Sequence, residues 1–251
     1  MTMHYDKDSD GIVTVTMDMS GPVNAMNEEF RNDFGAVIER LQAEQDLAGV
    51  VIASAKKVFF AGGDLNDLVA VTPATVGRFM EGITQVKAQL RALETLPVPV
   101  VAAINGAALG GGFEICLACN HRIAFNHASV QLGLPEVTLG LLPGGGGVVR
   151  MTKLLGLEAA LPFLLEGKRV KPVDALDAGM IHSLVEDRDN LVPQAKAWIL
   201  ENRDNPDAAV QPWDQKGYRI PGGGISSPKI QQTITGGTAM LMQKTRGLLP
   251  A

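Results

Sequence analysis

The chain has 251 residues, of which 46% are hydrophobic and 20% are charged, and its formal net charge is −5. These values describe a globular protein with a sizeable core, organised as one large domain or as one domain with an appendage. The acidic balance disfavours a general nucleic-acid-binding surface. No apolar run approaches the roughly 18 residues of a membrane span and no signal-peptide pattern opens the chain, so we expect a cytoplasmic protein without a membrane partner.

The first part of the chain alternates between strands and helices. Its predicted elements are a strand at residues 11–19, a helix at 28–45, a strand at 49–54, a short helix opened by Asp64 and a long helix at 72–96. Asn27 is a residue type that caps helices, and Pro97 ends the long helix. Residues 58–64 join the second strand to the short helix through a turn that contains two glycines.

The middle of the chain contains a second glycine turn. The apolar residues 99–104 predict a buried strand, and residues 113–119 predict a buried helix that begins next to the glycines at 110–112. Glu114 lies in the first turn of this helix, where unpaired backbone N–H groups favour negative charge. A tight packing turn with a capping Glu would have the same residues, so the motif alone leaves both interpretations open.

Shorter elements follow, and the composition changes after residue 204. The predicted ones are strands at residues 121–125, 129–132 and 181–185 and helices at 148–155, 157–165, 172–179 and 190–202. Strands alternating with helices predict an α/β architecture of repeated ββα or βαβ units. Residues 205–228 are rich in proline and glycine, and residues 229–246 are weakly helical with an interruption at Gly236 and Gly237. We therefore predict a catalytic core at residues 1–204 and an irregular, linker-like tail at 205–251.

The two glycine turns follow apolar strands that we expect to lie side by side, which would bring both turns to one end of the sheet. In that arrangement the backbone N–H groups of Ala61 and Gly111 can converge on one acceptor and form an oxyanion hole. A carbonyl held there becomes enolate-like, and its α-carbon becomes acidic. Proton transfer at that carbon then requires an acid or a base.

Two glutamates are candidates for this proton transfer. Glu114 is close in sequence to the second glycine turn, and Glu136 follows Pro135 within an otherwise apolar stretch, residues 130–142. Two carboxylates in one apolar pocket push their pKa values apart, so that one can act as an acid and the other as a base near neutral pH. Each Glu also has a simpler interpretation, as an exposed loop residue or a helix cap.

Other chemistries have less support. Cys116 and Cys119 form a CxxC on the apolar helix without a second ligand pair, which favours buried, reduced thiols over redox or metal use. The four histidines are scattered and lie in no metal-spacing motif, so we predict no metal site. The sequence lacks a G-x-S-x-G elbow, a G-x-x-x-x-G-K-[ST] phosphate loop and a G-x-G-x-x-G dinucleotide fingerprint in the glycine turn.

Several motifs together resemble the enoyl-CoA hydratase/isomerase (crotonase) superfamily. They are Phe60-Ala-Gly-Gly-Asp64, Ala103-Ile-Asn-Gly-Ala-Ala-Leu-Gly-Gly-Gly-Phe-Glu114, Gly133-Leu-Pro-Glu136 and Leu139-Gly-Leu-Leu-Pro-Gly-Gly-Gly-Gly147. They occur in the order and spacing of the family, within residues 11–202. The resemblance implies a crotonase-like spiral of ββα units with a C-terminal helical or irregular tail, a CoA thioester substrate, and an oxyanion hole formed by the Ala61 and Gly111 amides.

Glu at both acidic positions resembles the hydratases of this superfamily. The resemblance implies that Glu114 activates a water, that Glu136 delivers a proton to C2, and that trans-2-enoyl-CoA becomes 3-hydroxyacyl-CoA in fatty-acid β-oxidation. No separate cofactor is implied, because CoA is part of the substrate. Further residues implied in binding the substrate or its CoA are Lys56, Lys57, Gly62, Asp64, Gly110, Leu142 and Gly145. A solvated strand end is an equally good interpretation of the two lysines.

The C-terminal tail departs from the pattern of stand-alone family members. Those members usually finish with helices that cover the acyl pocket and help to form trimers, so the resemblance implies a homo-oligomer, either a trimer or a hexamer. Residues 212–221 resemble instead the linker after the hydratase part of the multifunctional fatty-acid oxidation α-subunit, which implies membership of a fatty-acid oxidation complex. Two alternatives to hydration stay open: Δ3-Δ2 enoyl-CoA isomerisation, and an inactive acyl-CoA-binding fragment of a multifunctional enzyme.

Overall fold

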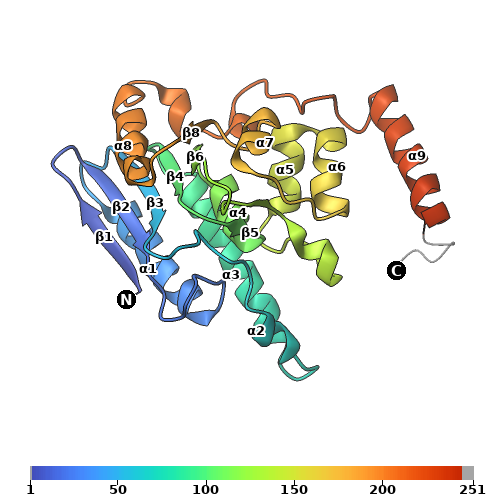
Figure 1. The fold of residues 1–251 in the computed structure, drawn as a ribbon, viewed down its shortest axis with the longest axis horizontal. Helices are drawn as coiled ribbons and strands as arrows, with labels where there is room; N and C mark the ends of the chain where they lie inside the picture. Colours follow the sequence, from blue (N-terminus) through green and yellow to red (C-terminus); the bar gives the residue numbers. More distant parts are fainter. Residues whose placement is uncertain (1, 245–251) are drawn as a thin grey trace.

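A computed structural model describes residues 2–244, and a mostly parallel sheet runs through it (Figure 1). The sheet has the order β1-β2-β3-β4-β6-β8, in which only the β1–β2 pair is antiparallel. Its strands are β1 (Met3–Lys7), β2 (Ile12–Met17), β3 (Gly49–Ser54), β4 (Val100–Ile104), β6 (His121–Phe125) and β8 (Ser183–Val185). A second, two-stranded parallel sheet pairs β5 (Ala108–Leu109) with β7 (Leu132–Gly133).

Helices connect the strands and cover both faces of the large sheet (Figure 1). The α-helices are α1 (Glu28–Ala43), α2 (Leu65–Val69), α3 (Val76–Glu94), α4 (Gly111–Ala118), α5 (Gly147–Leu155), α6 (Leu157–Leu165), α7 (Pro172–Asp177), α8 (Leu191–Glu201) and α9 (Pro228–Lys244). The 3₁₀ helices are η1 (Pro135–Leu139), η2 (Arg188–Asn190), η3 (Pro206–Ala209) and η4 (Pro212–Asp214). The α/β class predicted from the alternating elements is confirmed.

The two faces of the sheet bury different sets of side chains. On β3, Val50 and Ile52 belong to a core that also contains the buried faces of α1, α3 and α4. Val51 and Ala53 point the other way, into a smaller core completed by α8. Since side chains alternate along a strand, a continuous apolar run such as β3 requires cover on both faces. The apolar runs in the sequence therefore specify a sheet that lies between helices.

The first two glycine turns lie side by side, as predicted. β3 and β4 are parallel neighbours, with Val50 opposite Val100. Beyond their carboxyl ends, Phe60 forms a parallel bridge with Ala108, and the Leu109 N–H donates to the Phe60 carbonyl at 3.2 Å. The carboxyl ends of parallel strands are the usual ligand-binding end of such a sheet.

The structure differs from the predictions at several elements. Of the strand predicted at residues 129–132, only Leu132 lies in a strand, at the start of β7. β1 was not predicted, because its half-exposed residues show no apolar run and it gains its ladder only by pairing with β2. The long helix predicted from residue 72 begins at Val76, after a hydrogen-bonded turn in which the Val76 N–H donates to Thr72. The predicted interruption at Gly236 and Gly237 is wrong, because α9 continues through both residues to Lys244. Residues 245–251 of the predicted tail lie outside the described residues.

The segment after α8 packs along the outside of α3, α4, α5 and α6. The buried Gln211 side chain donates to the carbonyl of Ala118 at 3.2 Å, and Asp214 pairs with Arg91 at 2.7 Å. The Tyr218 hydroxyl donates to the Lys153 carbonyl, and α9 contacts α6 at the edge of the molecule (Figure 1). No helix in residues 2–244 has the length and apolar character required to cross a membrane.

Candidate active site

Glu114 is buried in the first turn of α4, with its side chain only 2% exposed. Gly110 caps this helix with φ of 54°, a conformation that favours glycine. The Gly147 N–H, at the N-terminus of α5, donates to Glu114 Oε1 at 2.7 Å. Burial raises the pKa of Glu114 above its usual range, against backbone hydrogen bonds from residues 145–147 and the charge of Arg150, which lower it. The carboxyl group is therefore desolvated and held by main-chain donors.

Glu136 lies beside this helix N-terminus, on η1 rather than on the predicted irregular loop. Pro135 starts the 3₁₀ turn and Gly140 ends it in the left-handed conformation. The position of a Cβ on Gly110 would be only 2.8 Å from Glu136 Oε1, so the carboxyl group rests against the N-cap of α4. Burial, together with the charge of Glu114, raises the pKa of Glu136 to about 7. Its Oε2 atom is buried without a hydrogen-bond partner in residues 2–244.

The predicted main-chain donors have different outcomes. Gly111 is the first residue of α4, where the helix geometry leaves the N–H without an intrahelical acceptor. Ala61, in contrast, donates its N–H to the Asn24 carbonyl at 2.9 Å. The prediction that Ala61 supplies the second donor is therefore wrong, because that N–H is already paired within the protein.

The backbone N–H of Gly63 replaces that of Ala61 as the second candidate donor. The Gly62 carbonyl accepts the Met26 N–H at 2.8 Å, and the C=O and N–H of one trans peptide point in opposite directions. The Gly63 N–H therefore points away from Met26. A Cβ added to Gly63 would meet no atom within 4 Å, so open space adjoins this residue. Sequence reasoning missed Gly63 because peptide orientation depends on the pairing with residues 24–26.

Asn24 positions the turn that contains Gly63, which the sequence alone did not indicate. Its fully buried side chain donates to the Phe59 carbonyl at 3.0 Å and to Ser54 Oγ at 2.9 Å, and accepts from the Met19 N–H at 3.1 Å. A short polar residue after a strand and a Gly-Pro pair was the available signal.

Replacing Asn24 with Ala should destabilise the fold by about 1–3 kcal/mol, because buried main-chain groups lose their partners. Urea unfolding measures this change. Asn126→Ala is a suitable control, since Asn126 makes one side-chain hydrogen bond to Glu186 on the exposed surface and should cost less than about 0.5 kcal/mol. Equal stability of the Asn24 variant and the wild type would contradict the assigned role.

The predicted lysines lie at the end of β3. Lys56 forms an ion pair with Asp18 at 2.7 Å, so its ammonium group already has a partner. Lys57 is exposed, and no ion pair involving it occurs among residues 2–244. Of the two, Lys57 is the more available to an anionic group.

The other predicted binding residues lie at different distances from the carboxylates. Gly62 has φ of 102° and packs against the Leu109 carbonyl, which keeps the first turn close to the second. A Cβ on Gly145 would be 2.7 Å from Glu114 Oε2, so this glycine touches the site directly. Leu142 is 77% exposed and lies at the surface. Asp64 is half-buried just before α2.

The CxxC motif has no exposed thiol. Cys116 and Cys119 are free and fully buried, which confirms the predicted reduced core thiols. Burial raises the pKa of both thiols above the usual range, so neither is a ready nucleophile. Among residues 2–244, no group of three His, Cys, Asp or Glu side chains is arranged to hold a metal ion.

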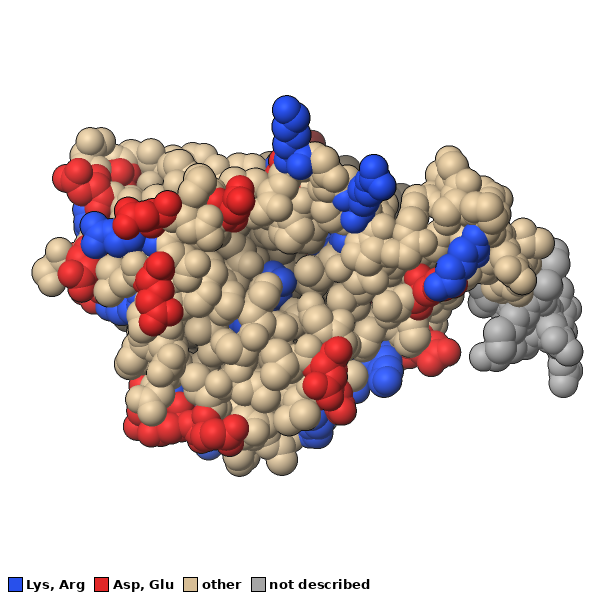
Figure 2. Space-filling view, turned by 90° about the horizontal axis from the view of Figure 1, so that it is seen from above, with Lys and Arg blue, Asp and Glu red and all other residues tan. Residues whose placement is uncertain are grey.

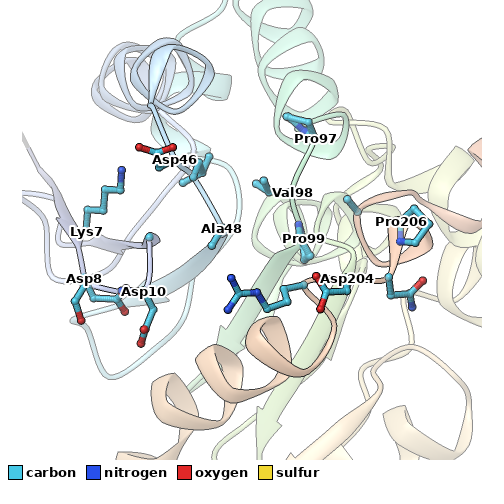
Figure 3. Close-up of a pocket in the computed structure, with 16 residues that line it drawn as sticks. Lys7, Asp8, Asp10, Asp46, Ala48, Pro97, Val98, Pro99, Asp204 and Pro206 are labelled. Carbon is cyan, nitrogen blue, oxygen red and sulfur yellow. The ribbon is translucent and has the colours of Figure 1, made fainter.

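A cavity of about 640 Å³ lies at the opposite end of the sheet from Glu114. Figure 3 shows Lys7, Asp8 and Asp10 on one side of it and Pro97 and Pro99 on the other. Lys7 ends β1, Asp8 and Asp10 come just before β2, and Pro97 and Pro99 come just before β4. The cavity therefore lies at the amino ends of the parallel strands, and neither glutamate lines it. On the face drawn in Figure 2, basic and acidic side chains are interspersed around a largely uncharged area.

Comparison with known proteins places this chain in a family. A family model described as enoyl-CoA hydratase/isomerase matches residues 7–215. The fatty acid oxidation complex subunit alpha of Shewanella halifaxensis is 40% identical over 186 residues, which cover 73% of this chain and 26% of the relative. The same subunit of Shewanella amazonensis is 39% identical over an equal span. The chain thus spans about a quarter of the length of these curated relatives.

Solved structures of similar proteins share the fold. The enoyl-CoA hydratase of Bacillus anthracis superposes with a TM-score of 0.75 at 26% identity, covering 99% of this chain and 91% of that one. DspI of Pseudomonas aeruginosa superposes with a TM-score of 0.73 at 28% identity, covering 83% and 77%. The predicted crotonase-like α/β fold is therefore confirmed. By its sequence match and its fold, the chain belongs to the enoyl-CoA hydratase/isomerase family.

Proposed function

We propose that this protein hydrates trans-2-enoyl-CoA thioesters to 3-hydroxyacyl-CoA in fatty-acid β-oxidation. The observation that supports hydration best is the pair of glutamates, in which burial and the charge of Glu114 raise the pKa of Glu136 to about 7. A hydratase must remove a proton from water and supply one to carbon, and two carboxyl groups with different affinities for protons suit these two roles.

The thioester oxygen would accept hydrogen bonds from the N–H groups of Gly63 and Gly111. Gly111 begins α4, and the Gly63 N–H points away from the loop, residues 24–26, that binds Ala61 and Gly62. Two main-chain donors stabilise the negative charge that develops on this oxygen when a nucleophile adds to C3. Each such donor is typically worth about 2.7–4 kcal/mol in the transition state.

Glu114 and Glu136 would divide the proton transfers between them. Ionised Glu114 takes a proton from water while the water oxygen bonds to C3, and protonated Glu136 gives a proton to C2. The carbon–carbon double bond becomes a single bond, and a proton then returns from Glu114 to Glu136 through water. No redox cofactor or metal takes part in these steps, so CoA is required only as part of the substrate.

Apolar side chains near the site suit the acyl chain. Leu65 and Val69 on α2 are 52% and 86% exposed, and Leu139 at the end of η1 is 57% exposed. Val149 on α5 is also 57% exposed. Of these elements, α2 follows the first glycine turn, η1 carries Glu136 and α5 begins at the Gly147 that binds Glu114. Exposed apolar groups on them indicate a surface that is covered by an apolar ligand or by another subunit. We propose both an acyl-CoA ligand and oligomerisation, as a trimer or hexamer or within a fatty-acid oxidation complex.

Crotonyl-CoA tests this proposal, because hydration removes the ultraviolet absorbance of its conjugated double bond. We expect turnover of crotonyl-CoA or of a longer trans-2-enoyl-CoA by the wild-type protein. A 3-enoyl-CoA distinguishes isomerisation from hydration, because isomerisation moves the double bond into conjugation and the ultraviolet absorbance rises. Binding of acyl-CoA without turnover of either substrate would contradict the proposal and support the binding-fragment alternative.

The pH dependence of kcat/KM provides a second test. If protonated Glu136 supplies the C2 proton, kcat/KM should fall as the pH rises through about 7, where this carboxyl group ionises. Stopped-flow or steady-state absorbance with crotonyl-CoA measures the profile. A profile that stays level from about pH 6 to 9 would rule out Glu136 as the proton donor.

A further inference from the structure

A turn of three glycines separates Glu114 from a buried guanidinium group. The turn consists of Gly145, Gly146 and Gly147. Cβ atoms on the first and third would lie 2.7 and 3.0 Å from the Glu114 carboxylate oxygens, whereas a Cβ on Gly146 would lie 2.6 Å from Arg150 Nη1. The main chain therefore has the carboxylate on one side and Arg150 on the other, with no room for a side chain between them.

Arg150 holds this turn through its main-chain oxygen. Its Nη1 donates to the Gly145 carbonyl at 3.0 Å, while the N–H groups of the turn face Glu114. A carbonyl bound on one side and N–H groups bound on the other restrict how the peptide planes can rotate. The position of the Glu114 carboxylate thus depends on the position of Arg150.

The carboxylate of Glu94 holds the Arg150 guanidinium group in place. Arg150 Nε and Nη2 donate to the two oxygens of Glu94 at 3.0 and 2.9 Å, and the two side chains are 9% and 2% exposed. A two-point guanidinium–carboxylate contact defines orientation as well as distance. A buried ion pair of this kind contributes little net stability compared with apolar residues of similar size. Stability alone therefore does not account for the pair, and a role in positioning does.

The network continues to the segment after α8. Arg91 donates to Glu94 at 2.9 Å and binds both oxygens of Asp214 at 2.7 and 3.0 Å. Gln211, three residues earlier, is bound to the carbonyl of Ala118 at the other end of the helix that bears Glu114. The same short segment therefore contacts α4 directly and reaches its catalytic end through three charged side chains.

We propose that Arg150 and Glu94 are positioning residues for Glu114, and that Arg91 and Asp214 connect this arrangement to the C-terminal segment. None of the four touches the substrate; they act on the reaction by holding the glycine turn that orients the water-activating carboxylate. This inference rests on the proposed hydratase function for its kinetic consequences, but the structural coupling can be measured without any substrate.

Arg150→Lys should lower kcat for crotonyl-CoA hydration by about 10- to 100-fold with little change in KM, because Lys retains the charge but cannot bind Glu94 and Gly145 together. Asp214→Asn, at the exposed end, should lower kcat by about two- to fivefold. In a Glu114→Gln background, Arg150→Lys should have almost no further effect, since a residue that acts through Glu114 is not additive with its loss.

Amide hydrogen exchange gives a readout that needs no activity. In Arg150→Lys, exchange should become faster in the peptide that contains Gly145, Gly146 and Gly147 and stay unchanged in β2 and β3. Arg78→Gln is the matched control, because Arg78 lies on the same helix as Glu94 and forms an exposed ion pair with Glu28. This control should leave both kcat and exchange as in the wild type.

The outcomes separate the two proposals. A wild-type protein that hydrates no enoyl-CoA would refute the proposed function, and local exchange in Arg150→Lys would still decide whether Arg150 orders the turn. An active wild type with unchanged kcat and exchange in Arg150→Lys would overturn the positioning role. If Arg150→Lys does not fold, Asp214→Asn decides: lower kcat with faster exchange in the glycine turn supports the network, and wild-type values for both overturn it.

Discussion

Replacing Glu114 with Gln should lower kcat for enoyl-CoA hydration by about 10²–10⁴-fold, the range expected for loss of a general base. Gln keeps the shape of the side chain and can still accept the hydrogen bond from the Gly147 N–H, which is 2.7 Å long in the wild type. It cannot take a proton from water. Steady-state absorbance with crotonyl-CoA measures the loss, and circular dichroism at equal concentration verifies that the variant is folded.

Glu136→Gln should cause a loss of similar size while increasing stability at alkaline pH. The folded-state pKa of Glu136, about 7, lies above its ordinary value of 4.5. Its contribution to stability is therefore fully present below the ordinary pKa and is lost as the pH rises through about 7. Gln has no such loss, so the variant should melt at a higher temperature than the wild type at pH 8, with a smaller difference at pH 5.

A third carboxyl group provides the control for both substitutions. Glu81 lies on α3, with an exposed side chain, and Glu81→Gln should leave kcat and melting temperature unchanged. Full activity in either Glu114→Gln or Glu136→Gln would remove that residue from the mechanism. Lower stability of Glu136→Gln at pH 8 would show that its carboxylate is not destabilised by burial.

A single methyl group in the glycine turn should also abolish most of the activity. Gly145→Ala would place a Cβ 2.7 Å from Glu114 Oε2, closer than Cβ atoms come to other atoms in proteins, and 3.2 Å from Leu90 Cδ1, a tight contact. Gly145 has no positive φ, so alanine fits the main chain and the closest conflict is with the carboxylate. Because displacements approaching 1 Å at a catalytic group cost about 10²-fold, we expect a loss of that order in kcat.

The neighbouring glycine supplies the matched control for this substitution. A Cβ on Gly144 would lie 3.9 Å from Ile83 Cγ2, an ordinary contact distance, and Gly144 also has no positive φ. Gly144→Ala should therefore keep kcat within about threefold of the wild type. Equal kcat values for Gly144→Ala and Gly145→Ala, measured with crotonyl-CoA, would show that the close approach to Glu114 has no part in catalysis.

Local patterns in the sequence determined the elements and several of their ends. The apolar spacing of residues 28–45 predicted the buried face of α1, and the Asn27 side chain caps that helix by accepting the Phe30 N–H. The uninterrupted apolar runs in β3 and β4 indicated strands buried on both faces, and their pairing brought the glycine turns together. These features depend on neighbours within a few residues, so sequence is enough to predict them.

Only part of the candidate site could be predicted from the sequence. Glu114 could be located from its place after the glycines, and Glu136 from its place after Pro135 in an apolar stretch. That Glu136 rests against Gly110, through a 3₁₀ turn, was visible only in the structure. Ala61 was the wrong donor in its turn. Its peptide faces Asn24, whereas the next peptide but one, which contains the Gly63 N–H, faces the other way. The direction of a peptide in an irregular turn depends on hydrogen bonds to a distant segment, and residue types do not encode it.

The sequence by itself determined that this chain is an α/β protein with two glycine turns and two glutamates suited to proton transfer. Only the tertiary structure decided which groups control those glutamates. Arg150 and Glu94 are 56 residues apart, and Asp214 lies 123 residues from Arg91, yet side-chain contacts join all four. Contacts between residues so distant in sequence arise from the packing of α3 against α4 and of α4 against α5. Folding brings their polar groups into a shared interior, where each requires a partner.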